Sequence, residues 1–264
     1  MKTIYAIMAL LVLAGCTDWK TAKNTAEPEE EEEPLPERFE NDDLPKAADE
    51  LFDDFMYYFA SNEDLQRRRI SFPLPTDTGE VAETEWQMNP FFTGAGQYTL
   101  IFNSAEEREL ANDTAIGSVL VEQIFLTADS VRLYHFQRDE ARWHMTAISQ
   151  QQLAENPNAA FLKFYQEFAT DSVFQQKSLM DEIEFSGPDP DDDFLQIEGF
   201  ITPDSWEAFA PELPRDTIYN IVYRQQPGRS KEKVFVICGI SNGLETELTF
   251  RQKRGRWKLA KLNE

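Results

Sequence analysis

Histidine and cysteine, the usual ligands of structural zinc, are scarce in this sequence. Its two histidines, His135 and His144, are expected on adjacent strands, and its two cysteines are far apart. A structural zinc site needs about four ligands at recognisable spacings. A calcium loop of the EF-hand type needs glycine at its sixth position and glutamate at its twelfth; counted from Asp189, these positions hold Phe194 and Phe200. We therefore expect no metal site and read the acidic segment as a solvated loop, with weak adventitious calcium binding as the alternative.

Patterns typical of covalent or acid–base catalysis are not found either. The sequence has no Gly-x-Ser-x-Gly elbow and no Cys–His arrangement of a thiol enzyme. Its many aromatic residues are expected mainly in the core or in pocket walls. We assign no catalytic residue and no cofactor. The tyrosines that are candidates for acid–base chemistry by type alone are Tyr57, Tyr58, Tyr98, Tyr134 and Tyr165.

The N-terminus has the pattern of an export signal. One positive charge, Lys2, precedes an apolar run over residues 4–14. This run is shorter than the roughly 20 residues of a transmembrane helix and fits a secretory signal. It ends in Leu13-Ala14-Gly15-Cys16, which resembles the lipobox of bacterial lipoproteins. The resemblance implies a signal peptide over residues 1–15, cleavage before Cys16 and a diacylglyceryl group on its thiol.

Lipidation at Cys16 would fix where the protein is found. Several acyl chains on one residue hold a protein to a membrane far more firmly than a single chain does. We therefore expect a lipid-anchored protein of the cell envelope, at the outer membrane, on its periplasmic or its surface side. The alternative is an ordinary secretory signal with an incidental cysteine.

Cysteine count and net charge exclude two classes of protein. With Cys16 lipidated, Cys238 has no partner within the chain, so a disulfide-stapled scaffold is excluded. Cys238 ends the apolar run Val234–Cys238, where a free cysteine usually acts as a small buried hydrophobe. The net charge of −23 repels phosphate backbones, so we expect no nucleic-acid partner.

Residues 16–43 are expected to form a disordered acidic tether. The stretch from Glu27 to Pro34 consists of acidic residues and prolines and offers no apolar side chain to bury. Such segments remain disordered and extend by self-repulsion. Residues 17–43 span at most about 90 Å when fully extended. Loose cation binding, or an address signal for one membrane leaflet, is the alternative use of the acidic run.

The rest of the chain carries an internal repeat. The segment Phe52–Ala60 is matched by Phe161–Ala169, and the segment Arg142–Ile148 is matched by Arg256–Leu262. Matching order and nearly matching separation favour duplication of one fold. A chance similarity of two amphipathic helices is the alternative. The predicted domains are a first repeat over residues 44–152 and a second repeat over residues 153–264.

Each repeat is expected to begin with a helix and to end in antiparallel strands, which makes the fold class α+β. Apolar residues recur at steps of three and four over residues 48–59 and 161–168, as on one face of a helix. Residues 244–251 alternate between apolar and polar types, as in a half-buried strand. Arg254-Gly255-Arg256 then turns the chain into a last strand that carries Trp257.

This order of elements, with its terminal tryptophan strand, resembles the nuclear-transport-factor-like (cystatin-like) cone. The resemblance implies a curved antiparallel sheet around the N-terminal helix, with a pocket between them. Cone domains often pair sheet to sheet, so we expect a monomer with an internal pseudo-dimer. The whole chain also resembles uncharacterised domain-of-unknown-function lipoproteins of Bacteroidetes, which implies location and architecture and no activity. A bundled α+β domain of other topology is the alternative fold.

Three functional hypotheses follow from these observations. The first is a non-enzymatic binding or interaction module whose partner is an unknown protein or small ligand. The second is a small-molecule enzyme that uses a cone-shaped pocket, as isomerases and dehydratases of the cone fold do. The third is a structural or glycan-associated spacer, suggested by the acidity and the aromatic content of the chain.

Overall fold

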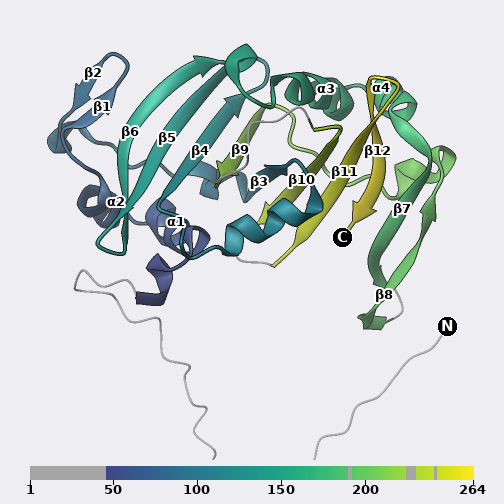
Figure 1. Ribbon diagram of the computed structural model, residues 1–264, viewed down its shortest axis with the longest axis horizontal. Coiled ribbons are helices and arrows are strands. Elements are labelled where there is room, and N and C mark those ends of the chain that lie inside the picture. The colour runs from purple at the N-terminus through teal and green to yellow at the C-terminus, as the bar shows by residue number, and fades with distance from the viewer. Residues whose placement is uncertain (1–45, 190–191, 224–229, 241–242) are drawn as a thin grey trace, which may run out of the picture. The chain divides into compact units, whose positions relative to one another are not determined.

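The computed structural model describes residues 46–189, 192–223, 230–240 and 243–264 (Figure 1). The predicted signal peptide, Cys16 and the acidic tether lie outside the described residues. The α-helices that it describes are α1 (Phe52–Ser61), α2 (Glu63–Arg69), α3 (Ala159–Thr170) and α4 (Ser172–Lys177). None of these helices has the length and apolar character that crossing a bilayer would require.

The first half of the described chain contributes six of its strands. They are β1 (Leu74–Thr76), β2 (Gly79–Val81), β3 (Gln97–Phe102), β4 (Ser118–Phe125), β5 (Ser130–Asp139) and β6 (Arg142–Gln152). The second half contributes β7 (Leu179–Asp189), β8 (Asp192–Ile201), β9 (Thr217–Val222), β10 (Glu232–Gly239), β11 (Glu245–Lys253) and β12 (Arg256–Asn263). Each half therefore begins with two helices and ends in strands, as expected for an α+β fold.

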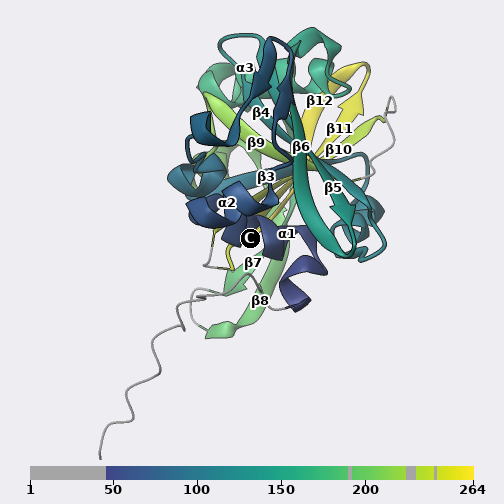
Figure 2. The ribbon, with the colours of Figure 1, turned by 90° about the vertical axis from the view of Figure 1, so that its left-hand side faces the viewer.

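Ten of the described strands form one curved sheet, in the order β6-β5-β4-β9-β3-β10-β11-β12-β7-β8 (Figure 1). Seen from the β6 end, the strands fan out, as the strands of a twisted sheet do (Figure 2). The expectation of two separate sheets, paired face to face, is wrong for these residues. The sheet is also mixed and not purely antiparallel, because β3 runs parallel to β9 and β7 runs parallel to β12.

The two halves are joined by an exchange of neighbours at the centre of the sheet. Strand β9, from the second half, pairs with β4 of the first, and β3, from the first half, pairs with β10 of the second. Central strands are buried on both faces, and the apolar runs in β3 and β10 suit that position. Leu100 and Val236 face one core, while Ile101 and Phe235 face the other.

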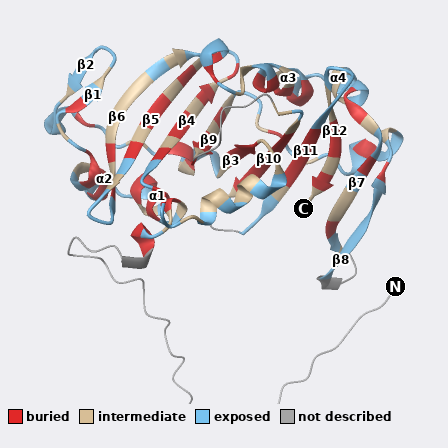
Figure 3. Cartoon of the chain, in the orientation of Figure 1, coloured by how far each residue is buried: buried red, intermediate tan, exposed pale blue. Residues whose placement is uncertain are grey.

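The two helix pairs cover opposite faces of the sheet. Residues of α1 pack in one apolar cluster with Val234, Val236 and Cys238, and residues of α3 pack in a second cluster with Phe235 and Ile237. Successive residues of a strand point to opposite faces, so the two clusters lie on opposite sides of β10. Figure 3 shows this burial as strongest in the central strands.

Several local predictions are confirmed. The periodic segments form α1 and α3, and their apolar faces are buried. The alternating segment forms β11, which turns through Arg254 and Gly255, both at positive φ, into β12. Cys238 is a free and buried residue of β10.

Candidate functional site

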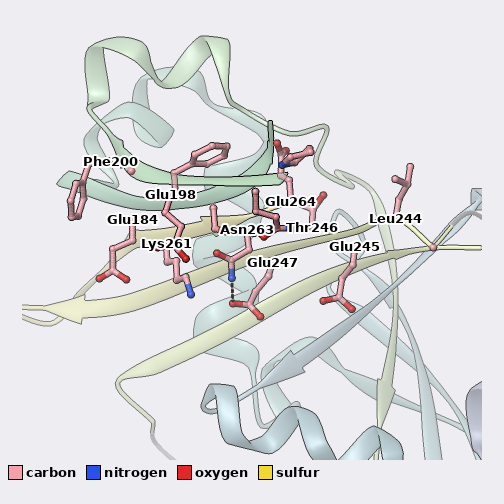
Figure 4. A pocket seen from close by; sticks show the side chains of 16 residues that line it. Glu184, Glu198, Phe200, Leu244, Glu245, Thr246, Glu247, Lys261, Asn263 and Glu264 are labelled. Atoms are coloured by element: carbon pink, nitrogen blue, oxygen red, sulfur yellow. Dashed lines mark hydrogen bonds between the residues drawn. The ribbon is translucent and has the colours of Figure 1, made fainter. Parts of the chain in front are cut away.

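A hollow of about 1190 Å³ lies along strand β8, over β11 and β12. It is on the sheet face that α3 and α4 leave uncovered, because Leu248, Phe250 and Leu259 of the same strands point into the α3 cluster instead. Figure 4 shows its side chains coming from β7 and β8 on one side and from β11 and β12 on the other. We call this hollow the trough. Its lining consists of Glu184, Phe185, Ser186, Pro188, Gln196, Glu198, Gly199, Phe200, Gly243, Leu244, Glu245, Thr246, Glu247, Lys261, Asn263 and Glu264.

The trough is rich in carboxylates, some of which are paired with arginine. Arg108, from the 3-10 segment Ala105–Asn112, donates from Nη1 to Oε2 of Glu247 at 2.6 Å and from Nη2 to Glu245. Asn263 donates to the other oxygen of Glu247 at 3.0 Å (Figure 4). Burial raises the pKa of Glu264. The floor of the trough is therefore a network of hydrogen-bonded polar side chains that carries excess negative charge.

A second hollow, of about 520 Å³, continues the trough toward α1. The two share Glu245, Glu247, Lys261 and Asn263 as lining residues. The second hollow ends at Asp53, which also lines a third hollow of about 410 Å³. Asp53 thus lies where the second and third hollows meet.

Asp53 lies in the first turn of α1 and accepts hydrogen bonds from two tyrosines. Tyr98 on β3 donates to its Oδ2 at 3.3 Å, and Tyr223, just beyond the end of β9, donates to its Oδ1. Burial raises the pKa of the Asp53 carboxyl; the bonds from Tyr223 and Tyr98 oppose the rise, and the charge of Asp54 adds to it. Cys238 lies beside Tyr98, and burial raises the pKa of its thiol to about 12. Both tyrosines and the thiol are therefore neutral at pH 7.

Two other buried carboxylates have purely internal partners. Glu122 on β4 is 3% exposed and accepts from Asn156 and Asn220, each at 2.7 Å. Burial raises its pKa. Asp49 pairs with Arg69 through both carboxylate oxygens, at 3.0 and 2.9 Å. Neither carboxylate lines the three hollows, so both are structural.

The histidines lie on adjacent strands, as predicted. His135 on β5 is within 2.8 Å of the Ser149 hydroxyl, and burial lowers the pKa of both His135 and His144. Over the residues that the structure describes, no group of three or more His, Cys, Asp or Glu side chains is placed to hold a metal ion. The acidic segment that begins at Asp189 falls partly outside these residues.

The structure separates the tyrosines that were candidates by type. Tyr134 and Tyr165 are buried in the two cores, whereas Tyr98 reaches Asp53 and Tyr57 lines the third hollow. Tyr58 is partly buried against the α1 core. Sequence reasoning missed Asp53 and Tyr223. Asp53 carried one weak signal, since it is an acid at the start of a strongly apolar helix.

The space between helix and sheet, where a cone pocket is expected, is filled on both faces. Phe59 meets Phe136 edge to face at 5.5 Å in the first core, and Phe168 meets Phe250 in the same way at 5.1 Å in the second. Such packing is that of an ordinary aromatic core. Among the described residues, the trough lies away from both aromatic cores, whereas the second and third hollows reach the N-terminal end of α1 at Asp53.

Comparison with known proteins agrees with this fold. Residues 31–264 match the family described as "Domain of unknown function (DUF4348)". The chain is similar to the crystal structure of an NTF2-like protein from Bacteroides fragilis NCTC 9343, with a TM-score of 0.76 and 38% sequence identity. The similarity covers 84% of this chain and 98% of that one. No curated protein matches the chain.

The family match covers the folded part and residues 31–43 of the acidic segment before it, and the structural match supports a mixed α+β architecture with a curved sheet. Neither match carries a known activity. The chain belongs to the DUF4348 family of domains of unknown function.

Proposed function

We propose that this chain is a lipid-anchored protein of the bacterial cell envelope that binds an extended segment of a partner protein along β8 and the trough. It performs no chemistry on that partner. The observation that carries the proposal is the edge of β8, which ends the sheet, pairs with no further strand among the described residues and exposes apolar side chains beside a large hollow.

Strand β8 is suited to pair with another strand. An edge strand presents unpaired backbone groups, and proteins usually protect such an edge or use it to bind an extended peptide. Leu195 is 55% exposed, Ile197 39% and Phe200 69%. Gln196, Glu198 and Phe200 line the trough, whereas Leu195 and Ile197 alternate with them and face the opposite side. An added strand would meet apolar contacts on both faces.

The charge of the trough favours a basic partner segment. Five glutamates line it and one lysine, Lys261, faces them. Arg108 balances part of this charge through Glu245 and Glu247. Complementary charge steers partners and rejects others of like sign. The segment is therefore expected to carry Lys or Arg between apolar residues, and the acidic stretch of residues 27–34 is a poor occupant.

The anchor part of the proposal rests on Cys16 and its lipobox-like context. Metabolic labelling with a palmitate analogue tests it independently of binding. We expect label on the chain and none on Cys16→Ser, which should be released from the membrane fraction. Unlabelled protein, or membrane association that survives Cys16→Ser, would contradict anchoring.

Site-specific photocross-linking in cells tests the binding part. A photoreactive phenylalanine analogue at Ile197 should give one discrete protein adduct. The matched control is the same analogue at Val173 of α4, which is 59% exposed and lies away from the trough. The adduct should contain a basic, extended segment of the partner and should be absent at Val173. No adduct at Ile197, or the same adduct at both positions, would overturn the proposal.

An isomerase- or dehydratase-like activity is the second candidate. It is favoured by Asp53, whose carboxyl has a raised pKa and lies between two tyrosine hydroxyls. Such groups can act as general acid and base. The aromatic side chains that fill the two cores, where a cone pocket is expected, argue against this candidate. Deuterium uptake by a small enolisable ketone that is lost in Asp53→Asn would favour this candidate over a binding protein.

A further inference from the structure

The third hollow is a separate concavity from the trough. Its volume of about 410 Å³ is within the range of small-molecule pockets. It lies at the N-terminal end of α1, beside the end of β10. Its lining consists of Asp53, Asp54, Tyr57, Phe92, Tyr98, Gly239 and Ile240.

Within the described ranges, no basic side chain lines this hollow beside its negative charge. Asp53 and Asp54 are adjacent, and no Lys or Arg is among the lining residues. Other carboxylates have a basic partner: Asp49 is paired with Arg69, and Glu245 and Glu247 of the trough are both paired with Arg108. Burial and the charge of Asp54 raise the pKa of Asp53, and the bonds from Tyr223 and Tyr98 oppose the rise.

The groups that bond Asp53 are neutral donors and leave room for a further partner. Tyr98 takes one oxygen and Tyr223 the other, while each carboxylate oxygen can accept two bonds. The nearby Cys238 adds no charge, since its thiol has a pKa raised to about 12. An ammonium group could therefore bond Asp53 without displacing either tyrosine.

Aromatic rings form the rest of the wall. Phe92 and Tyr98 lie with ring centroids 5.0 Å apart, and Tyr57 is 44% exposed at the opening. Ring faces attract cations, and recognition of ammonium ligands commonly combines such rings with a carboxylate. Ile240 adds an apolar contact. The wall thus matches a ligand with a positive head and an apolar body.

We propose that this hollow binds a small organic ammonium ion, with its charged group on Asp53 and Asp54 and its apolar body against Tyr57, Phe92 and Tyr98. The site is independent of the strand-binding edge. Binding requires ionised Asp53, so affinity should weaken as the pH falls through its raised pKa. The groups closest to it are Asp54 on the same helix and the neutral Tyr98, Tyr223 and Cys238. The other titratable side chains that line the second hollow with Asp53 are Arg108, Glu109, Glu245, Glu247 and Lys261.

Titration of the purified chain with benzylammonium chloride, followed by amide and aromatic NMR shifts, tests the site. Benzyl alcohol and benzoate, which have the same ring without the positive charge, are the neutral and anionic control ligands. We expect saturable shifts around Asp53 and Tyr98, with the ammonium ion binding at least about tenfold more tightly than the alcohol, as a bond to a charged group predicts. Equal binding of ammonium and alcohol, or no saturable shift, would overturn the proposal.

Variants locate the charge that matters. Asp54→Asn should weaken benzylammonium binding several-fold and Asp53→Asn by about tenfold or more. Asp64→Asn removes an equal charge from an exposed site on α2 and is the matched control; it should change the affinity less than twofold. Because Asp54 is exposed and makes no bond to Tyr98 or Tyr223, its variant tests the site even if Asp53→Asn folds poorly. Equal effects of Asp54→Asn and Asp64→Asn would show general charge attraction and contradict the site.

Discussion

The two edges of the sheet are treated in opposite ways. At the β6 edge, backbone groups of Trp143 and Met145 are hydrogen-bonded to residues between Asp49 and Ser71, which come much earlier in the chain. Asp49 accepts from the Trp143 amide at 3.2 Å, Arg69 donates to the Trp143 carbonyl at 3.2 Å, and the Ser71 amide donates to the Met145 carbonyl at 2.9 Å. The β1–β2 hairpin lies beside this edge (Figure 1).

At β8 no such cover is found among the residues that the structure describes. No backbone hydrogen bond joins residues 195–201 to anything outside the β7–β8 ladder within the described ranges. The exposed strand is visible in Figure 3. A molecule that closes one edge with a buried ion pair and leaves the other bare has one edge available for a partner strand.

Removal of Arg69 should have the largest effect, because it opens the closed edge. Arg69 and Asp49 are 4% and 8% exposed, and Arg69→Ala would leave Asp49 buried without its partner. We expect a loss of about 3–5 kcal/mol in the free energy of unfolding, measured by urea denaturation. Lys253→Ala, which breaks a 3.8 Å exposed pair with Asp181, is the control and should cost less than about 0.5 kcal/mol. Equal losses in the two variants would show that the ion pair does not hold the edge.

Glu122 tests the sheet between its edges. In Glu122→Ala the side-chain amides of Asn156 and Asn220 lose their acceptor in a buried site. An unsatisfied buried donor costs about 1–3 kcal/mol, so denaturation should show a smaller loss than in Arg69→Ala. A larger loss would mean that the centre and not the closed edge dominates stability.

The protonation of Glu122 should make stability depend on pH. Burial raises its pKa in the folded state above 4.5. The folded chain therefore holds this proton more tightly than the unfolded chain. Its contribution to stability is full below pH 4.5 and is lost as the pH rises through the raised pKa. Glu122→Gln should flatten this part of the stability profile in denaturation at a series of pH values. An unchanged profile would contradict the assignment.

Changes on β8 should have the smallest effect on stability. Ile197→Lys places a charge on an exposed side chain of the open edge, and surface changes usually stay within about 0.5 kcal/mol. Edge lysines oppose strand pairing, so the adduct formed by a photoreactive group at Phe200 should disappear in this variant. A marked loss of stability, or an adduct that persists, would contradict the claim that β8 is an open edge used for pairing.

The sequence predicted individual helices and strands better than it predicted which strands pair in the sheet. Periodicity located α1, α3 and the β11–β12 hairpin because it depends on which face of an element is buried. It could not show that β9 inserts between β4 and β3, since pairing partners leave little trace in a single sequence. Leu195-Gln196-Ile197 alternates like a half-buried strand, so the exposure of β8 follows only from its place at the end of the sheet.

The candidate site was the least predictable part. Asp53, Tyr98 and Tyr223 come from α1, β3 and the end of β9, which are far apart in the chain and meet only because the two halves share one sheet. Tyr98 was one of five tyrosines chosen by type, and nothing in the spacing separated it from the core residues Tyr134 and Tyr165. Whether the halves descend from one duplicated unit stays a prediction.

Amide hydrogen exchange of the purified chain tests most directly the claim that one edge is closed and the other open. The amides of Ser71 and Trp143 should exchange as slowly as those inside the sheet, because each is bonded at the β6 edge. Every second amide between Leu195 and Ile201 should exchange with little protection, because it points away from β7. Strong protection of all the β8 amides would show that this edge is already covered and would contradict the account.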